Sequence, residues 1–203
     1  LSSGGALDPG FVGRSAELRK IASLVESDEV RIVTLIGPGG VGKTRLARRA
    51  MQELAAGFAD GTLFVELEDV EDPGGIAARV ARELALDGPE SEATERLLRH
   101  LAGRRTLIVL DNFEHLATGA EMLDRWLDTC AGLKLIVTSR VRLGLAGEHL
   151  LPLEGLPCAE PEDVDCVEAF DATKLFARSA QRVDPAFRPD AEAASVIDIC
   201  RRV

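Results

Sequence analysis

The chain has 203 residues, of which 46% are hydrophobic and 29% are charged, a balance that is ordinary for a soluble globular protein. The formal net charge of −10 argues against broad contact with a nucleic-acid backbone or an anionic membrane. No apolar run approaches the length of about 20 residues that spans a bilayer. The four cysteines are scattered, as is typical of reduced thiols in a cytosolic protein. We therefore expect a cytoplasmic protein that makes no direct contact with nucleic acid or membrane through this chain.

We expect no targeting segment in the first residues of this sequence. Leu1-Ser2-Ser3-Gly4-Gly5 lacks the basic segment and the apolar core of a signal peptide. We expect residues 1–10 to be a flexible linker or a cloning remnant. Ser15 is a candidate N-cap for a helix that carries an apolar face at Leu18, Ile21, Ala22 and Val25.

Residues 37–44 have the sequence Gly-Pro-Gly-Gly-Val-Gly-Lys-Thr, which is the pattern of a phosphate-binding loop. An apolar, β-branched run at 31–36 precedes it, and apolar residues at helical spacing follow it to near Gly57. The strand, loop and helix thus occur in the order that the motif requires. In such a loop the backbone N–H groups and the positive end of the helix bind phosphate oxygens.

This motif predicts a role for each of its residues. Lys43 is expected to reach the β- and γ-phosphates, and the Thr44 hydroxyl is expected to ligate Mg²⁺. The predicted nucleotide contacts of the loop are Gly37, Pro38, Gly39, Gly40, Val41, Gly42, Lys43, Thr44 and Arg45.

A second strand is predicted over 61–67, from its β-branched and apolar residues. Asp72-Pro73 then predicts a helix cap followed by proline at the first helical position. This helix is expected to end at Gly88-Pro89. A further helix carries Leu97, Leu98 and Leu101.

Residues 106–111 form an apolar run that ends in an acid, the form of a Walker B strand. Its carboxylate, Asp111, is expected to hold Mg²⁺ at the C-terminal end of the strand. Such a run is common on its own, but here a phosphate-binding loop lies about 70 residues upstream. Thr44 and Asp111 are therefore the predicted magnesium ligands.

Another helix and two strands follow. The helix contains Trp126, which we expect in the core. The strand at 133–138 leads into Arg140, which either contacts a γ-phosphate at the ligand-binding edge of the sheet or is an exposed loop arginine. A strand at 149–153 is expected at the sheet edge, because Pro152 cannot donate to a ladder.

The end of the chain is predicted to be helical. Residues 157–165 are rich in proline and acids, as in a linker. Two helices follow, the first bearing Phe170, Leu175, Phe176 and Val183, and the second ends at Val203 without a capping glycine. The whole pattern predicts an α/β fold, a three-layer P-loop NTPase sandwich with a parallel sheet of about five strands. We expect a nucleotide-binding domain at 11–156 and the start of a truncated helical subdomain at 157–203.

Four blocks of sequence together resemble a known group, the signal-transduction ATPases with numerous domains, also called AP-ATPases or NB-ARC-like ATPases. Within that group the chain is similar to the ATPase modules of bacterial transcriptional regulators of the AfsR/SARP and large LuxR type. The blocks are 11–14 (Phe-Val-Gly-Arg) with 17–18, then 34–46, then 107–116 (Leu-Ile-Val-Leu-Asp-Asn-Phe-Glu-His-Leu), and 135–140 with 153–156.

The resemblance implies several functional features. Phe11, Val12 and Arg14 would frame the adenine and ribose, and Arg140 would sense the γ-phosphate. Bound ATP or ADP, with Mg²⁺, would switch the protein between closed and open states. Effector domains outside this chain, DNA-binding or cyclase-like, and a helical-repeat sensor would belong to the same polypeptide. The sequence leaves open whether that polypeptide is a monomer or a homo-oligomer. The family's Gly-Leu-Pro-Leu motif, which covers the adenine, does not occur before Val203, so the base-side pocket is expected to be half missing.

The residue after Asp111 bears on hydrolysis. Related ATPases often carry a second acid there, whereas this chain has Asn112, whose amide cannot accept a proton. Hydrolysis should be slow unless Glu114 is the general base. The alternative for Glu114 is a solvated glutamate that favours the start of a helix.

The preferred interpretation is a regulatory ATP/ADP switch with slow Mg²⁺-dependent hydrolysis. One alternative is an AAA-type ring-forming ATPase or DNA-replication initiator, in which Arg142 could act on a neighbouring subunit. A small-molecule kinase is a further alternative, but it would leave the Phe11 block unexplained.

Overall fold

The computed structural model describes residues 10–202, so the predicted linker at 1–10 lies almost entirely outside the described residues. The chain forms two compact units. The first comprises residues 16–154, and the second comprises residues 10–15 with 155–202. The sequence placed residues 11–15 in the nucleotide-binding domain, whereas their contacts in the structure group them with the second unit.

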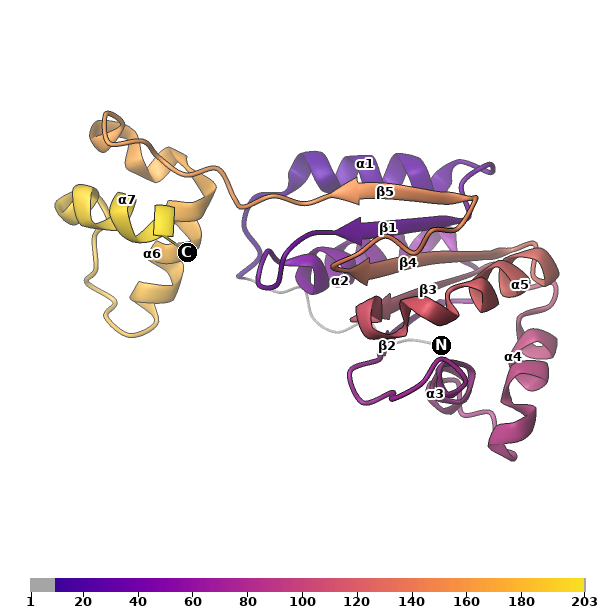
Figure 1. The fold of residues 1–203 in the computed structure, drawn as a ribbon. Coiled ribbons are helices and arrows are strands. Elements are labelled where there is room, and N and C mark those ends of the chain that lie inside the picture. The colour runs from indigo at the N-terminus through magenta and orange to yellow at the C-terminus, as the bar shows by residue number, and fades with distance from the viewer. Residues whose placement is uncertain (1–9, 203) are drawn as a thin grey trace. The chain divides into compact units, whose positions relative to one another are not determined.

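The first unit contains one five-stranded sheet in the order β2-β3-β4-β1-β5, and every pair of neighbouring strands is parallel (Figure 1). The predicted parallel sheet is therefore confirmed. The strand that contains Pro152 lies at the edge, as its missing N–H group predicted. The strands are β1 (Ile32–Ile36), β2 (Thr62–Glu66), β3 (Thr106–Asp111), β4 (Leu133–Ser139) and β5 (Glu148–Pro152).

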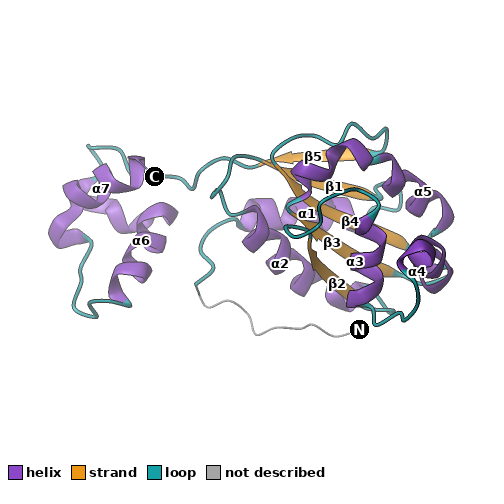
Figure 2. Cartoon of the chain, turned by 60° about the horizontal axis from the view of Figure 1, so that its bottom comes forward, coloured by secondary structure: helices purple, strands orange, loops and turns teal. Residues whose placement is uncertain are grey.

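Helices cover both faces of this sheet, and the central strands are buried along their whole length. One face packs against α3 (Gly75–Glu83), α4 (Ala93–Leu101) and α5 (Glu121–Thr129), which lie together in Figure 2. Helix α2 (Lys43–Leu54) packs against β3 and β4, and α1 (Ser15–Glu26) buries Ile21 and Val25. Side chains alternate along each strand, so each central strand supplies apolar residues to both helical layers.

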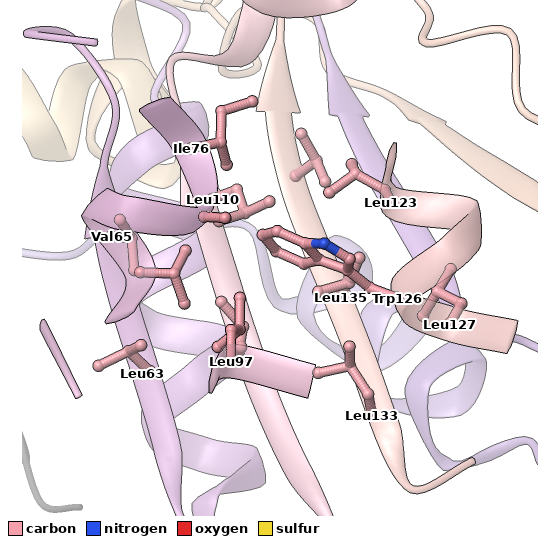
Figure 3. Packing of buried hydrophobic residues seen from close by; sticks show 14 of the residues in the cluster. Leu63, Val65, Ile76, Leu97, Leu110, Leu123, Trp126, Leu127, Leu133 and Leu135 are labelled. Atoms are coloured by element: carbon pink, nitrogen blue, oxygen red, sulfur yellow. The ribbon is translucent and has the colours of Figure 1, made fainter. Parts of the chain in front are cut away.

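Trp126 lies at the centre of the larger core. Figure 3 shows its ring among Leu110, Leu123 and Leu135, and its exposed fraction is 0%. The prediction that Trp126 belongs to the core is confirmed. Leu97 of α4, which also has an exposed fraction of 0%, belongs to the same cluster and comes from a different helix. The cluster thus joins three helices to one face of the sheet.

Helix α3 begins later than the sequence indicated. Asp72 was expected to cap it, but the helix starts at Gly75. The Asp72 carboxylate accepts the Gly74 N–H at 2.8 Å, and the Asp72 carbonyl accepts the Gly75 N–H at 3.1 Å. Asp72 therefore closes a turn before the helix, because its side chain bonds the backbone two residues on.

The second unit has a small core of its own. Ala159, Val167, Val196 and Ile197 form it, and Phe170 and Phe176 pack against it. Its helices are α6 (Asp171–Gln181) and α7 (Ala193–Arg202). Ala159 is 1% exposed, so the segment expected to be a linker takes part in this core. Val183, expected on the apolar face of a helix, lies beyond the end of α6 and is 89% exposed.

We expect Leu97→Ala to lower the free energy of unfolding of the first unit by about 2–5 kcal/mol, because it leaves a cavity in the larger core. Urea unfolding followed by the fluorescence of Trp126, the chain's single tryptophan, measures the change. Leu150→Ala is the matched control. Leu150 is 44% exposed on β5, so its loss should be about 1 kcal/mol or less. Equal losses in the two variants would contradict this description of the core.

Candidate nucleotide-binding site

Three neighbouring strands of the sheet have their C-terminal ends on the same side. Ile36 of β1 lies beside Ser139 of β4 in parallel register, and Asp111 ends β3 on the other side of β4. Strand β1 pairs with β4 and β5, while the chain leaving β1 crosses to β2 at the far edge. The connections thus diverge beside β1, which is where open α/β sheets bind ligands. The fold brings the glycine loop, Asp111 and Arg140 together at the C-terminal ends of these strands.

The glycine loop links β1 to α2, as the sequence predicted. Gly40 and Gly42 adopt φ angles of 79° and 95°, which glycine reaches without strain. A Cβ atom on Gly37 would lie 2.7 Å from the Leu153 carbonyl oxygen. The backbone therefore requires glycine at these positions, and the loop leads directly into the N-terminus of α2.

Lys43 is the first residue of α2 and is 8% exposed. Its ammonium group donates to the carbonyl oxygens of Gly37 and Pro38, both at 2.9 Å. Burial lowers the pKa of Lys43, while the nearby carboxylates of Glu114 and Asp111 raise this pKa and the Arg140 guanidinium lowers it. The ammonium group is thus held by the loop, within electrostatic reach of three charged side chains from β3 and beyond.

Asp111 and Thr44, the predicted magnesium ligands, are in direct contact. The Thr44 hydroxyl lies 2.9 Å from each carboxylate oxygen of Asp111, to which it donates. Asp111 is 2% exposed. A hydroxyl and a carboxylate supply the hard oxygen ligands that Mg²⁺ prefers. The donor set fits the ion that the sequence predicted there.

Thr138 is a member of this cluster that the sequence analysis missed. It is fully buried on β4, donates to Asp111 Oδ1 at 2.5 Å and accepts the Asn112 N–H at 3.0 Å. Asn112 itself adopts a left-handed conformation with φ 62°. The available signal was a polar residue that directly follows the apolar run 135–137, near the C-terminal end of the strand. Thr138 therefore fixes both the carboxylate and the turn that follows it.

Glu114 and Arg140 form an ion pair at the same edge, with 2.9 Å between Arg140 Nε and Glu114 Oε1. The guanidinium lies beside the loop, because a Cβ on Gly39 would be 3.4 Å from its terminal nitrogen. Arg45 is exposed on α2. Phe11, Val12 and Arg14 belong to the second unit, where Arg178 of α6 donates to the Phe11 carbonyl at 3.2 Å. Their predicted contact with the base remains a prediction.

Comparison with known proteins gives consistent matches. The profile of the AAA domain family matches residues 27–149. A protein named as an HTH-type transcriptional regulator in Mycobacterium tuberculosis is 38% identical over 176 residues, which cover 85% of this chain and 19% of that protein. The regulatory protein AfsR of Streptomyces griseus is 31% identical over 204 residues, covering 94% of this chain and 19% of AfsR.

Solved structures show the same fold. A signal transduction ATPase with numerous domains and a tetratricopeptide repeat sensor, from Pyrococcus horikoshii, superposes with a TM-score of 0.51 at 21% identity. The match covers 92% of this chain and 27% of that one. The chain thus spans about a fifth of the length of the two regulators above. Within residues 10–202, no helix has the length and apolar character to cross a membrane.

We expect Thr138→Val to lower the free energy of unfolding by about 1–3 kcal/mol, because the buried Asp111 carboxylate and the Asn112 N–H each lose a partner while the side-chain shape is kept. Chemical denaturation of the parent and the variant measures the change in the free energy of unfolding. Thr129→Val is the matched control, since that hydroxyl donates to the Arg125 carbonyl at an exposed position. A Thr138→Val loss no larger than that of the control would contradict the positioning role.

The stability of the chain should depend on pH through Lys43. Because its pKa is lowered in the folded chain from the usual 10.5, the unfolded chain binds more protons between the two values. Stability therefore rises as pH increases through that window. We expect the parent to gain stability relative to Lys43→Met as the pH rises toward 10.5, as measured by denaturation at a series of pH values. A constant difference would contradict the lowered pKa.

Proposed function

The chain belongs to the AAA domain family, and on that premise we propose that it is the ATP/ADP-binding switch module of a larger transcriptional regulator. The observation that supports this most directly is the contact between Thr44 and Asp111, at 2.9 Å, beside the buried Lys43. A phosphate-binding loop, a metal-binding carboxylate and a lysine are the parts that P-loop proteins use to hold a nucleoside triphosphate. Here they come from β1, β3 and α2.

Each part has a role in this proposal. The N–H groups of the glycine loop and the N-terminus of α2 bind phosphate oxygens. Lys43 exchanges part of its contact with the loop carbonyls for the β- and γ-phosphates. Thr44 and Asp111 hold Mg²⁺, which neutralises charge on the phosphates when it is bound.

Hydrolysis by this module is proposed to be slow. Asn112 follows Asp111 at the position where a proton acceptor would be expected, and its side-chain amide cannot accept a proton. Its backbone N–H donates to the Thr138 hydroxyl, which fixes the position of the residue. Glu114 is the nearest alternative acceptor in the sequence, and it is engaged by Arg140. Slow turnover suits a switch, because each state must persist long enough to be sensed by other domains.

The regulatory role rests on the relatives. Two of them are named as regulators, and the remaining four fifths of their length is available for other domains. We propose that this chain works in a cytoplasmic protein whose effector and sensor domains read the nucleotide state, alone or as a homo-oligomer. Contact with DNA is assigned to those other domains, because the net charge of this chain is −10.

Calorimetric titration with ATP and with ADP, in the presence and absence of Mg²⁺, tests the proposal. We expect micromolar binding that Mg²⁺ strengthens, with turnover below about 1 per second, the low end of enzyme rates. Lys43→Ala should abolish ATP binding while circular dichroism and the melting temperature show a folded chain. Lys20→Ala, at an exposed position on α1, is the matched control and should bind as the parent does. Equal ATP affinity in Lys43→Ala and the parent would refute the proposed site.

A further inference from the structure

The Arg140–Glu114 ion pair joins a fixed partner to a movable one. Glu114 is held by its neighbours Phe113 and Leu116, both fully buried, and its side chain is 22% exposed. Arg140 follows the end of β4, and its side chain is 64% exposed. The long arginine can therefore leave the pair by rotating its side chain, whereas the carboxylate stays in place.

The Glu114 carboxylate depends on this partner. Oε1 is bound by Arg140, and Oε2 is buried with no hydrogen-bond partner among residues 10–202. A buried carboxylate oxygen without partners is costly, so the guanidinium compensates much of the charge. Removing Arg140 would leave Glu114 as an unpaired acid beside the glycine loop.

We propose that this pair is a latch that a γ-phosphate opens: the phosphate takes the Arg140 guanidinium and thereby releases Glu114 to act as the general base. This rests on the proposed function of the site. The guanidinium already lies against Gly39 of the loop, next to where that function places the terminal phosphate. Guanidinium groups bind phosphate with two parallel hydrogen bonds, which compete well with a single contact to a carboxylate.

The released carboxylate completes the reaction. The oxygen of a water molecule forms a bond to the γ-phosphorus, and its proton passes to Glu114. The bond between the γ-phosphorus and the oxygen that bridges to the β-phosphate breaks, and its electron pair leaves with ADP. Inorganic phosphate is the other product. With ADP there is no γ-phosphate, so Arg140 returns to Glu114 and the base is blocked again.

A double-mutant cycle on nucleotide affinity tests the latch without relying on turnover. ADP and a non-hydrolysable ATP analogue are titrated into the 203-residue parent, Arg140→Ala, Glu114→Gln and the double variant. Arg140→Ala should weaken binding of the analogue about tenfold or more and binding of ADP by less than about twofold. Only the analogue has a γ-phosphate, so only its complex loses a charge-assisted hydrogen bond to Arg140. Glu114→Gln should tighten the analogue about twofold to fivefold, because the Arg140–Glu114 ion pair no longer has to be broken. Glu95→Gln, an exposed acid on α4, is the control for loss of one charge.

The outcomes separate the latch from its premise. Tightening of the analogue by Glu114→Gln that disappears in the Arg140→Ala background supports the latch. Equal tightening in both backgrounds would show simple relief of charge repulsion and would overturn it. An Arg140→Ala variant that keeps the parent's preference for the analogue over ADP would also overturn it. A parent that binds neither nucleotide would refute the proposed function itself, and the latch with it.

Discussion

The Asp111 carboxylate ties together the three segments on which the candidate site depends. It accepts hydrogen bonds from the hydroxyl groups of Thr44 at the start of α2 and Thr138 on β4, while Asp111 itself ends β3. A carboxylate that is 2% exposed pays a large desolvation cost, which these hydrogen bonds offset. Thr138 in turn binds the Asn112 N–H and fixes the turn that leads to Glu114. The positions of the loop, the acid and the following turn are therefore coupled through one buried group.

Buried lysines occur at both ends of this sheet, and their chemistry alone does not separate them. Lys43 and Lys134 are 8% and 9% exposed, each donates to two backbone carbonyls, and burial lowers the pKa of each. Lys134 binds the carbonyls of Ser27 and Val30, in the connection between α1 and β1, and so closes the N-terminal side of the sheet. Lys43 lies at the C-terminal side, where the strand connections diverge. The topology of the sheet therefore decides which of the two ammonium groups can bind a ligand.

Local patterns predicted the elements well, and long-range pairing decided what they could not show. The predicted bounds of β3 agree with the structure at both ends, because the strand coincides with an apolar run that stops at an acid. The resemblance to AfsR-type regulators is confirmed by the relatives. The role of Thr138 required the β3–β4 pairing, which no local pattern specifies. The contacts of Phe11 within the second unit depend likewise on packing between segments that are far apart in the sequence, such as its hydrogen bond with Arg178 at a separation of 167 residues.

The exposure of an arginine determines whether it can change partners. Arg31 donates to the carbonyls of Leu133, Leu127 and Cys130, and all three belong to or flank elements of the core, so its contacts hold the fold. Arg140 has one carboxylate partner and is 64% exposed. An exposed ion pair contributes at most about 1 kcal/mol, whereas breaking a buried one costs about 3–5 kcal/mol. Water solvates the exposed Arg140 guanidinium as it moves, so the cost of separating the pair falls on Glu114, whose side chain is 22% exposed. A phosphate that accepts two guanidinium N–H groups can offset that cost. The same pair buried in the core would hold one state regardless of the nucleotide.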